Sequence, residues 1–156
     1  MERQRKEERQ TVLILIELTD WETIEKGYAV YADCMYLPTK EKYQQKMQAY
    51  LQDVAIKIYG CFCETALKGL LVLRSFPQKQ AELVGIAVEE SSRRQGIGTL
   101  MLRQVMESCC LQAVFAETDE DAVEFYRKSG FSVENHIETY DGKPVARYTC
   151  RLERYN

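Results

Sequence analysis

Histidine is almost absent from this sequence, and the cysteines lack the spacing that metal sites use. His136 is the one histidine among 156 residues, and none of the six cysteines forms a Cys-x-x-Cys pair. Ordinary zinc sites are built from such pairs or from grouped histidines. We therefore predict no metal and a structural or surface role for His136. For most cysteines we predict buried packing, since a free cysteine behaves as a small hydrophobe.

Long apolar runs are missing too. The longest covers residues 12–16, far short of the roughly 20 residues that cross a bilayer as a helix. Residues 1–10 alternate between acidic and basic side chains, whereas a secretory signal contains an apolar stretch. We therefore expect no membrane association, a cytoplasmic location and reduced thiols.

Positive charge is not in excess, because 21 basic residues face 24 acidic ones and the net charge is −3. Bulk nucleic-acid binding needs a large basic surface, so we predict no nucleic-acid partner. The chain length fits one domain. We expect that domain to cover 1–156, with 1–10 as a charged, loosely ordered segment. The sequence leaves the oligomeric state open, a homodimer included.

Hydrophobic periodicity predicts both helices and strands. Thr19, Thr39 and Thr118 stand where a side chain can cap the start of a helix. The expected helices cover about 21–35, 40–54, 99–109 and 119–129, and the apolar face of the second includes Leu51 and Val54. Apolar and β-branched runs predict seven strands: 12–18, 55–64, 67–76, 82–88, 113–117, 131–139 and 144–152.

A basic, glycine-containing turn lies between the strand at 82–88 and the helix at 99–109. It reads Arg93-Arg94-Gln95-Gly96-Ile97-Gly98. N–H groups at a helix start have no intrahelical partner, and the helix dipole adds positive charge there. Glycines let the backbone approach a ligand closely. Together these features predict a pyrophosphate site. A Rossmann-type dinucleotide site is disfavoured, because Met101 holds the position of its third glycine.

This turn resembles the acyl-CoA-binding motif of the GNAT acetyltransferases, Arg/Gln-x-x-Gly-x-Gly/Ala. Arg93, Gly96 and Gly98 fill it. The stretch at 119–131 resembles the second GNAT signature, a short helix that ends in Phe-Tyr-x-x-x-Gly-Phe. The expected element order, β-α-α-β-β-β-α-β-α-β-β, is also similar to that of the family. The residues that match the second signature are Phe125, Tyr126, Gly130 and Phe131.

The resemblance implies a mixed α+β GNAT fold, with a central sheet of about seven strands, mostly antiparallel, and helices on both faces. The helix at 99–109 connects the fourth and fifth strands, so this pair should be parallel. In the GNAT fold the two strands splay apart, and the cofactor enters the gap. We expect Gly85 to form the bulge that starts the splay. Alternatively, it leaves room for a packed helix.

The resemblance implies acetyl-CoA as the cosubstrate. Amides of the splayed strand would polarise the thioester carbonyl and pair with the pantetheine like an added strand. Amides of the turn would hold the pyrophosphate, with added charge from an arginine. Asp119 stands near where many family members carry an asparagine. The predicted cofactor-binding residues are Ile86, Ala87, Val88, Arg93, Arg94, Gln95, Gly96, Ile97, Gly98, Thr99, Asp119, Phe125 and Tyr126.

The resemblance also implies that a primary amine attacks the thioester directly in a ternary complex. Tyr126 would be the general acid for the departing thiolate, since a phenol has a pKa of about 10. Alternatively, its ring packs in the groove and its hydroxyl bonds to backbone. Glu82 and Glu117 are the candidate general bases, each acting through a water. Alternatively, either is a solvated carboxylate.

Two functions follow from these motifs. The first is an acetyl-CoA-dependent N-acetyltransferase, and the second is a non-catalytic module that binds or senses acyl-CoA. Acidic residues between Glu117 and Glu124 would suit a cationic amine acceptor. Alternatively, they complement a helix dipole and aid solubility.

Overall fold

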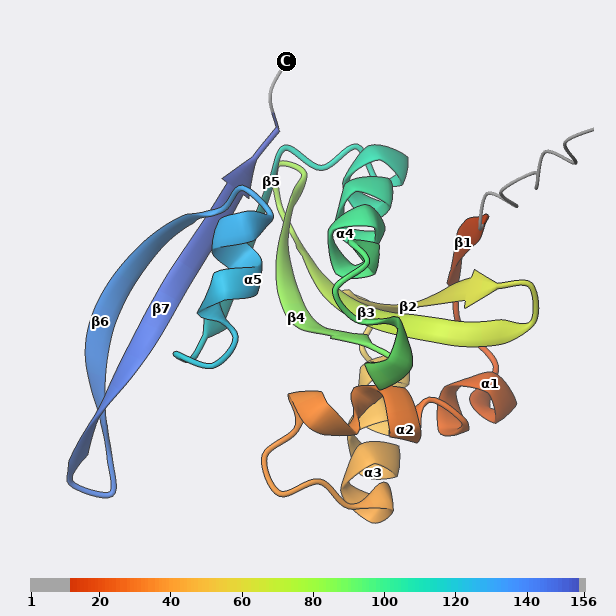
Figure 1. The fold of residues 1–156 in the computed structure, drawn as a ribbon, viewed down its shortest axis with the longest axis horizontal. Coiled ribbons are helices and arrows are strands. Elements are labelled where there is room, and N and C mark those ends of the chain that lie inside the picture. The colour runs from red at the N-terminus through yellow and green to blue at the C-terminus, as the bar shows by residue number, and fades with distance from the viewer. Residues whose placement is uncertain (1–11, 155–156) are drawn as a thin grey trace, which may run out of the picture.

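A seven-stranded sheet in the order β1-β2-β3-β4-β5-β7-β6 organises the computed structural model, which describes residues 12–154 (Figure 1). The expected charged segment at 1–10 lies outside the described residues. Only β4 and β5 are parallel, and the other neighbours are antiparallel. The predicted α+β fold is therefore confirmed. The strands are β1 (Leu13–Glu17), β2 (Ile56–Cys63), β3 (Ala66–Phe76), β4 (Gln80–Val88), β5 (Ala113–Thr118), β6 (Ser132–Tyr140) and β7 (Lys143–Glu153).

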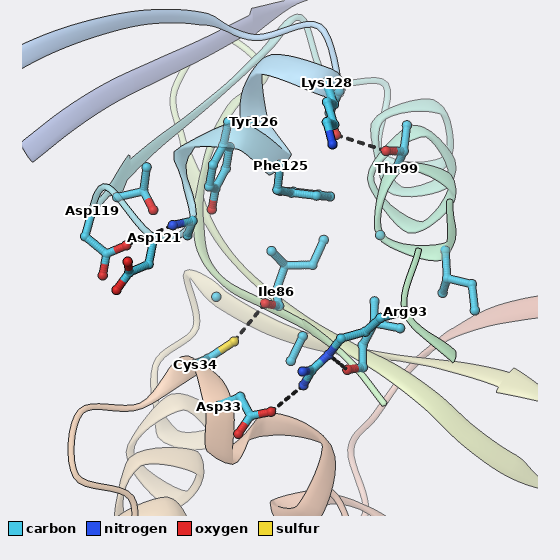
Figure 2. A pocket seen from close by; sticks show the side chains of 18 of the residues that line it. Asp33, Cys34, Ile86, Arg93, Thr99, Asp119, Asp121, Phe125, Tyr126 and Lys128 are labelled. Carbon is cyan, nitrogen blue, oxygen red and sulfur yellow. Dashed lines mark hydrogen bonds and ion pairs between the residues drawn. The ribbon is translucent and has the colours of Figure 1, made fainter. Parts of the chain in front are cut away.

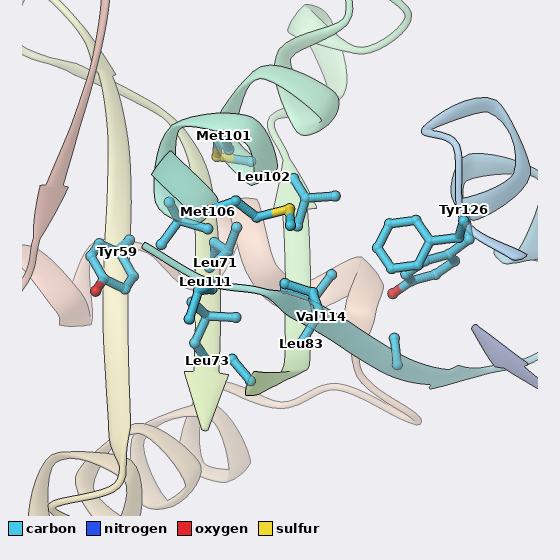
Figure 3. Packing of buried hydrophobic residues seen from close by; sticks show 14 of the residues in the cluster. Tyr59, Leu71, Leu73, Leu83, Met101, Leu102, Met106, Leu111, Val114 and Tyr126 are labelled. Carbon is cyan, nitrogen blue, oxygen red and sulfur yellow. The ribbon is translucent and has the colours of Figure 1, made fainter. Parts of the chain in front are cut away.

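Helices cover both faces of the sheet, as the resemblance implied. On one face, Met101, Leu102 and Met106 of α4 pack onto strand residues such as Leu71 and Val114 (Figure 3). A second cluster joins α1, α2 and α3 to the other face. No helix among residues 12–154 has the length and apolar character that crossing a membrane requires. The helices are α1 (Trp21–Glu25), α2 (Tyr28–Tyr31), η1 (Ala32–Cys34), α3 (Lys40–Gln52), η2 (Glu90–Ser92), α4 (Ile97–Ser108) and α5 (Val123–Lys128).

The first helical region differs from the prediction of one helix at 21–35. It breaks at Gly27 into α1 and α2 and then tightens into η1, which suits the low helix propensity of glycine. Its cap is also different. The carboxylate of Asp20, and not Thr19, accepts a hydrogen bond from the Thr23 N–H at 3.0 Å.

The predicted cap of α3 is confirmed, because Thr39 Oγ1 accepts from the Lys42 N–H at 3.1 Å. The predicted apolar face of this helix is too long. Leu51 is 41% exposed and Val54 is fully exposed, because the helix ends at Gln52 and the chain turns away before Val54 reaches the core.

The start of α5 also differs from the prediction, since Asp119 Oδ1, and not Thr118, accepts from the Ala122 N–H at 3.0 Å. Thr118 is still the last residue of β5. The predicted end of α5 is confirmed. Gly130 is left-handed, with φ of 94°, and the Phe131 N–H bonds back to Tyr126 O at 3.0 Å, as in a Schellman motif.

Only Cys61 and Cys150 are buried among the six cysteines. The prediction of buried packing for most of them is therefore wrong. Cys34 is exposed because η1 lies at the surface of a pocket, and Cys110 is exposed in the turn that follows α4.

The strands β4 and β5 separate after only three paired positions, which end at Glu82 and Phe115. Next in β4, Val84 is an extra residue, because Leu83 and Gly85 face successive residues of β3. The bulge next to Gly85 is therefore confirmed. The alternative for Gly85 also holds, since a Cβ there would lie 1.9 Å from the hydroxyl oxygen of Tyr31 in α2. Residues 84–88 of β4 consequently have one edge without a strand neighbour.

We expect Gly85→Ala to lower the free energy of unfolding by about 1–3 kcal/mol, because the added methyl group overpacks against Tyr31. Urea denaturation measures this change. In a Tyr31→Phe background the nearest clashing atom is gone, so the same substitution should cost less. An equal cost in both backgrounds would show that the contact does not decide the identity of residue 85.

Candidate functional site

A pocket of about 1070 Å³ opens where β4 and β5 separate (Figure 2). One wall is the part of β4 from Val84 to Val88, and another is the start of α4 from Gly96 to Thr99. The third wall is formed by α5 and the loop before it, and η1 adds Asp33 and Cys34. The pocket therefore brings together both regions that the sequence motifs singled out.

The first turn of α4 presents its backbone to this pocket. Its cap, Gly96, is left-handed with φ of 77° and makes no side-chain cap bond. A Cβ on Gly96 would meet no atom within 4 Å, so the loop stays open toward the pocket. The amides of the first helical turn have no intrahelical acceptor, and the helix dipole adds positive charge there. This end of α4 is suited to an anion.

Gly98 has a role beyond the one expected from sequence. A Cβ there would lie 2.8 Å from the ring of Phe125 in α5, so the missing side chain lets the two helices meet. Thr99 Oγ1 and Ser129 Oγ join the same two helices at 2.9 Å. Gly98 thus sets the distance between two walls of the pocket as well as the access to the α4 backbone.

The two arginines of the turn have different surroundings. Arg93 donates from Nε to Val88 O at 3.0 Å and forms an ion pair with Asp33 of η1 (Figure 2). It therefore ties the turn to β4 and to η1. Arg94 lines the pocket and has no ion pair with any residue in 12–154, which leaves its charge available to a ligand. Gln95, which follows them in the chain, is not part of the pocket wall.

The unpaired edge of β4 carries side-chain contacts at two carbonyls. Alternate residues send their backbone groups to the same edge of a strand. Ile86 O accepts from the Cys34 thiol at 2.8 Å, and Val88 O accepts from Arg93. Cys34 is exposed as a residue, but its thiol lies against Ile86 O, and loss of hydration there raises the pKa of the thiol to about 11, although the bond to Ile86 opposes this shift. The thiol is therefore a protonated donor at neutral pH.

Tyr126 is buried in the α5 wall, with 6% of its surface exposed. Its ring makes edge contacts with Phe125 and Phe131, at centroid distances of 5.2 and 5.1 Å. In Figure 2 its hydroxyl points into the cavity, and Cys34 lies on the opposite wall. No bond from this hydroxyl to backbone is found among residues 12–154. Burial raises the pKa of Tyr126 above its ordinary value, with smaller contributions from Cys150 and Cys34.

The structure separates the two carboxylates that the sequence proposed as bases. Glu117 is at the end of β5, lines the pocket and accepts from Thr149 Oγ1 at 2.8 Å. Glu82 is on β4 before the bulge, outside the pocket wall, and lies 3.5 Å from Arg74. Asp119 lines the pocket, although its Oδ1 already caps the turn before α5.

Asp33 and Cys34 are pocket residues that the sequence reasoning missed. They lie in η1, where Cys34 contacts Ile86 of β4, 52 residues later in the chain, and Asp33 contacts Arg93 of the turn, 60 residues later. No motif surrounds them, and an amphipathic helix was expected through this segment. The packing of α2 against Gly85 and the contacts of Cys34 and Asp33 with Ile86 and Arg93 place η1 at the pocket.

Residues 18–131 match the family model described as the acetyltransferase (GNAT) family, and this stretch is most of the chain. The chain belongs to this family. A GNAT-family protein from Desulfovibrio desulfuricans has a TM-score of 0.72 at 16% identity, covering 91% of this chain and 99% of that one. An Elizabethkingia anophelis GNAT acetyltransferase with acetyl-CoA bound has a TM-score of 0.64 at 19% identity, covering 91% and 98%.

A third solved structure is a Bacillus subtilis acetyltransferase in complex with CoA. Its TM-score is 0.61 at 17% identity, with coverage of 92% of this chain and 98% of that one. At these identities the solved structures show the GNAT fold for this chain.

The raised pKa of Tyr126 predicts a pH dependence of stability. An unfolded tyrosine ionises at a pKa of about 10, and the folded state holds the proton more tightly. The contribution of Tyr126 to the free energy of unfolding is thus complete below about pH 10 and is lost as the pH rises further. We expect Tyr126→Phe to lose less stability than the parent as the pH rises above about 10. Urea unfolding at several pH values measures this, and parallel curves would contradict it.

Proposed function

We propose that this GNAT protein transfers an acetyl group from acetyl-CoA to a primary amine by direct attack in a ternary complex. The observation that carries the proposal is the composition of one pocket. It joins an unpaired strand edge, the anion-suited start of α4 and the protonated phenol of Tyr126.

The cofactor end of the pocket follows from charge and backbone geometry. The first-turn amides of α4, with Arg94, suit the pyrophosphate, because they combine unpaired donors with positive charge. The edge of β4 at 84–88 suits the amides of the pantetheine arm, which would add to it like a strand. An edge N–H directed at the thioester oxygen would stabilise the charge that develops in the transition state.

Tyr126 is proposed as the general acid. The amine nitrogen forms a bond to the acetyl carbon, and the carbon–sulfur bond breaks. The departing thiolate then takes the phenolic proton, and solvent restores the proton to Tyr126. A phenol with its ordinary pKa of about 10 is already protonated at neutral pH, and the contacts with Phe125 and Phe131 hold the ring in one orientation.

Glu117 is the better supported of the two candidate bases, because it lines the pocket and Glu82 does not. Through a water it would accept the proton that the ammonium group of the acceptor loses before the free amine attacks. Asp119 and Asp121 lie on the same pocket wall. The carboxylates favour an acceptor with a cationic amine, since opposite charge raises its local concentration.

The purified protein should release free thiol from acetyl-CoA only when an amine acceptor is present. A panel of small diamines, amino acids and lysine peptides measures this. We expect Tyr126→Phe to lower kcat about 10²–10⁴-fold, which is the usual contribution of general acid catalysis, with an unchanged Kd for acetyl-CoA.

Tyr36→Phe is the matched control, because Tyr36 is 88% exposed and lies outside the pocket wall. Unchanged turnover in Tyr126→Phe would rule out the acid role. Binding of acetyl-CoA without thiol release for any acceptor would favour the non-catalytic acyl-CoA-binding module.

Separate substitutions of Glu117 and Glu82 distinguish the two candidate bases. We expect Glu117→Gln to lower kcat/KM for the amine at neutral pH by about 10²-fold or more, and Glu82→Gln to lower it less. Steady-state rates at saturating acetyl-CoA measure both. A larger loss in Glu82→Gln would assign the base to Glu82 and overturn the assignment from pocket position.

A further inference from the structure

A second group of polar side chains lies on the strand face that is turned away from α5. Cys150 is buried and the ring of Tyr148 packs beneath Arg127 of α5, so Thr149 between them faces the other way. Glu117 of β5 is paired with Thr149 of β7. His136 of β6 is paired with Arg147, which lies two residues before Thr149 and therefore on the same face of β7. The three strands β5, β7 and β6 therefore place these side chains on one face.

Three ligand atoms converge there from Glu117, His136 and Glu138. His136 Nε2 lies 2.9 Å from Glu138 Oε1 and 3.8 Å from Glu117 Oε2. All three ligand atoms lie within 4.8 Å of one another. The residues come from β5 and β6, two strands that β7 separates in the sheet. His136 and Glu138 are two residues apart in β6, whereas Glu117 joins them only through the arrangement of the sheet.

Hydrogen bonds within the protein do not join all three ligand atoms. An imidazole nitrogen carries at most one proton, and the Nε2 of His136 is close enough to bond only Glu138. The 3.8 Å separation from Glu117 is too long for a hydrogen bond. Within residues 12–154, Glu117 Oε2 thus has no donor, although it is directed at the same point as the other two ligand atoms.

The outer oxygens of both carboxylates are held by hydroxyl groups. Thr149 Oγ1 donates to Glu117 Oε1 at 2.8 Å, and the Tyr140 hydroxyl donates to Glu138 Oε2. Each carboxylate therefore directs its other oxygen toward His136. Metal sites use outer partners of this kind to orient their ligands.

We propose that Glu117, His136 and Glu138 bind one divalent transition-metal ion, with Zn²⁺ as the best fit. One imidazole nitrogen and two carboxylate oxygens are accepted zinc ligands, and a water or a substrate group would complete a tetrahedral site. The two carboxylates balance the charge of the ion. The side chains of Glu117, His136 and Glu138 are 49%, 36% and 42% exposed, so the ion can enter from solvent.

The proposed metal site shares Glu117 with the pocket. A bound ion would therefore occupy the Glu117 oxygen that would otherwise accept the proton of the acceptor amine. Zinc would then inhibit acetylation. This consequence rests on the proposed function, whereas the binding of the ion does not. The proposal also departs from the expectation of no metal, which considered sequence spacing alone.

Calorimetric titration of the full chain with Zn²⁺ tests the site, together with the visible absorption of added Co²⁺. We expect the parent to bind one more ion than His136→Gln, and Glu138→Gln to weaken that binding at least about tenfold. Thr149→Val should weaken it about 10–100-fold, the usual effect of losing an outer partner. Circular dichroism and thermal melting check that each variant is folded.

Glu134→Gln is the matched control, because Glu134 is an exposed carboxylate of β6, two residues from His136 and outside the cluster. It should keep the site. Any zinc that the cysteines bind is the same in all variants and does not affect the comparison. Cobalt bound to thiolates is recognised by its sulfur charge-transfer bands. Equal zinc binding by the parent and His136→Gln would overturn the proposal. An equal loss in Glu134→Gln and Glu138→Gln would also overturn it, because it would reduce the effect to general surface charge.

Discussion

The separation of β4 from β5 is the constraint on which the rest of the structure depends. Parallel pairing stops at Glu82, and the extra residue Val84 turns the following part of β4 away. Gly85 then lets Tyr31 of α2 reach the strand, where any Cβ would collide with its hydroxyl. The sheet thereby gains an internal edge whose backbone groups face a pocket, and no other pair of neighbouring strands is opened in this way among residues 12–154.

The two sides of the gap are stabilised by different interactions. On the β4 side, Arg93 links the loop before α4 to Val88 and to Asp33 of η1. On the β5 side, Tyr126 and Phe131 anchor α5 to the core, and Gly98 lets Phe125 pack against α4. The start of α4 is therefore held between both walls, with its amides facing the pocket. The charge of Arg94 remains unpaired within the described chain, which favours an anionic ligand over a neutral one.

Much of the fold could be predicted from the sequence, because its signals are local. The glycine-containing turn before α4 and the end of α5 at Gly130 each depend on a few neighbouring residues, and the structure contains both. The failures were also local. The cap at Asp20 competes with Thr19, and the break at Gly27 interrupts a pattern whose apolar spacing would otherwise continue.

The sequence by itself determined the order of the strands, the bulge next to Gly85 and the family, because turn chemistry and hydrophobic period act over short distances. Only the tertiary structure decided which side chains share the pocket. It placed Glu117 on the pocket wall and Glu82 beside Arg74, and it brought Cys34 to Ile86. It also gathered Glu117, His136 and Glu138 on one face. These contacts join residues that are far apart in the chain, and their distances depend on strand register and twist, which no local pattern encodes.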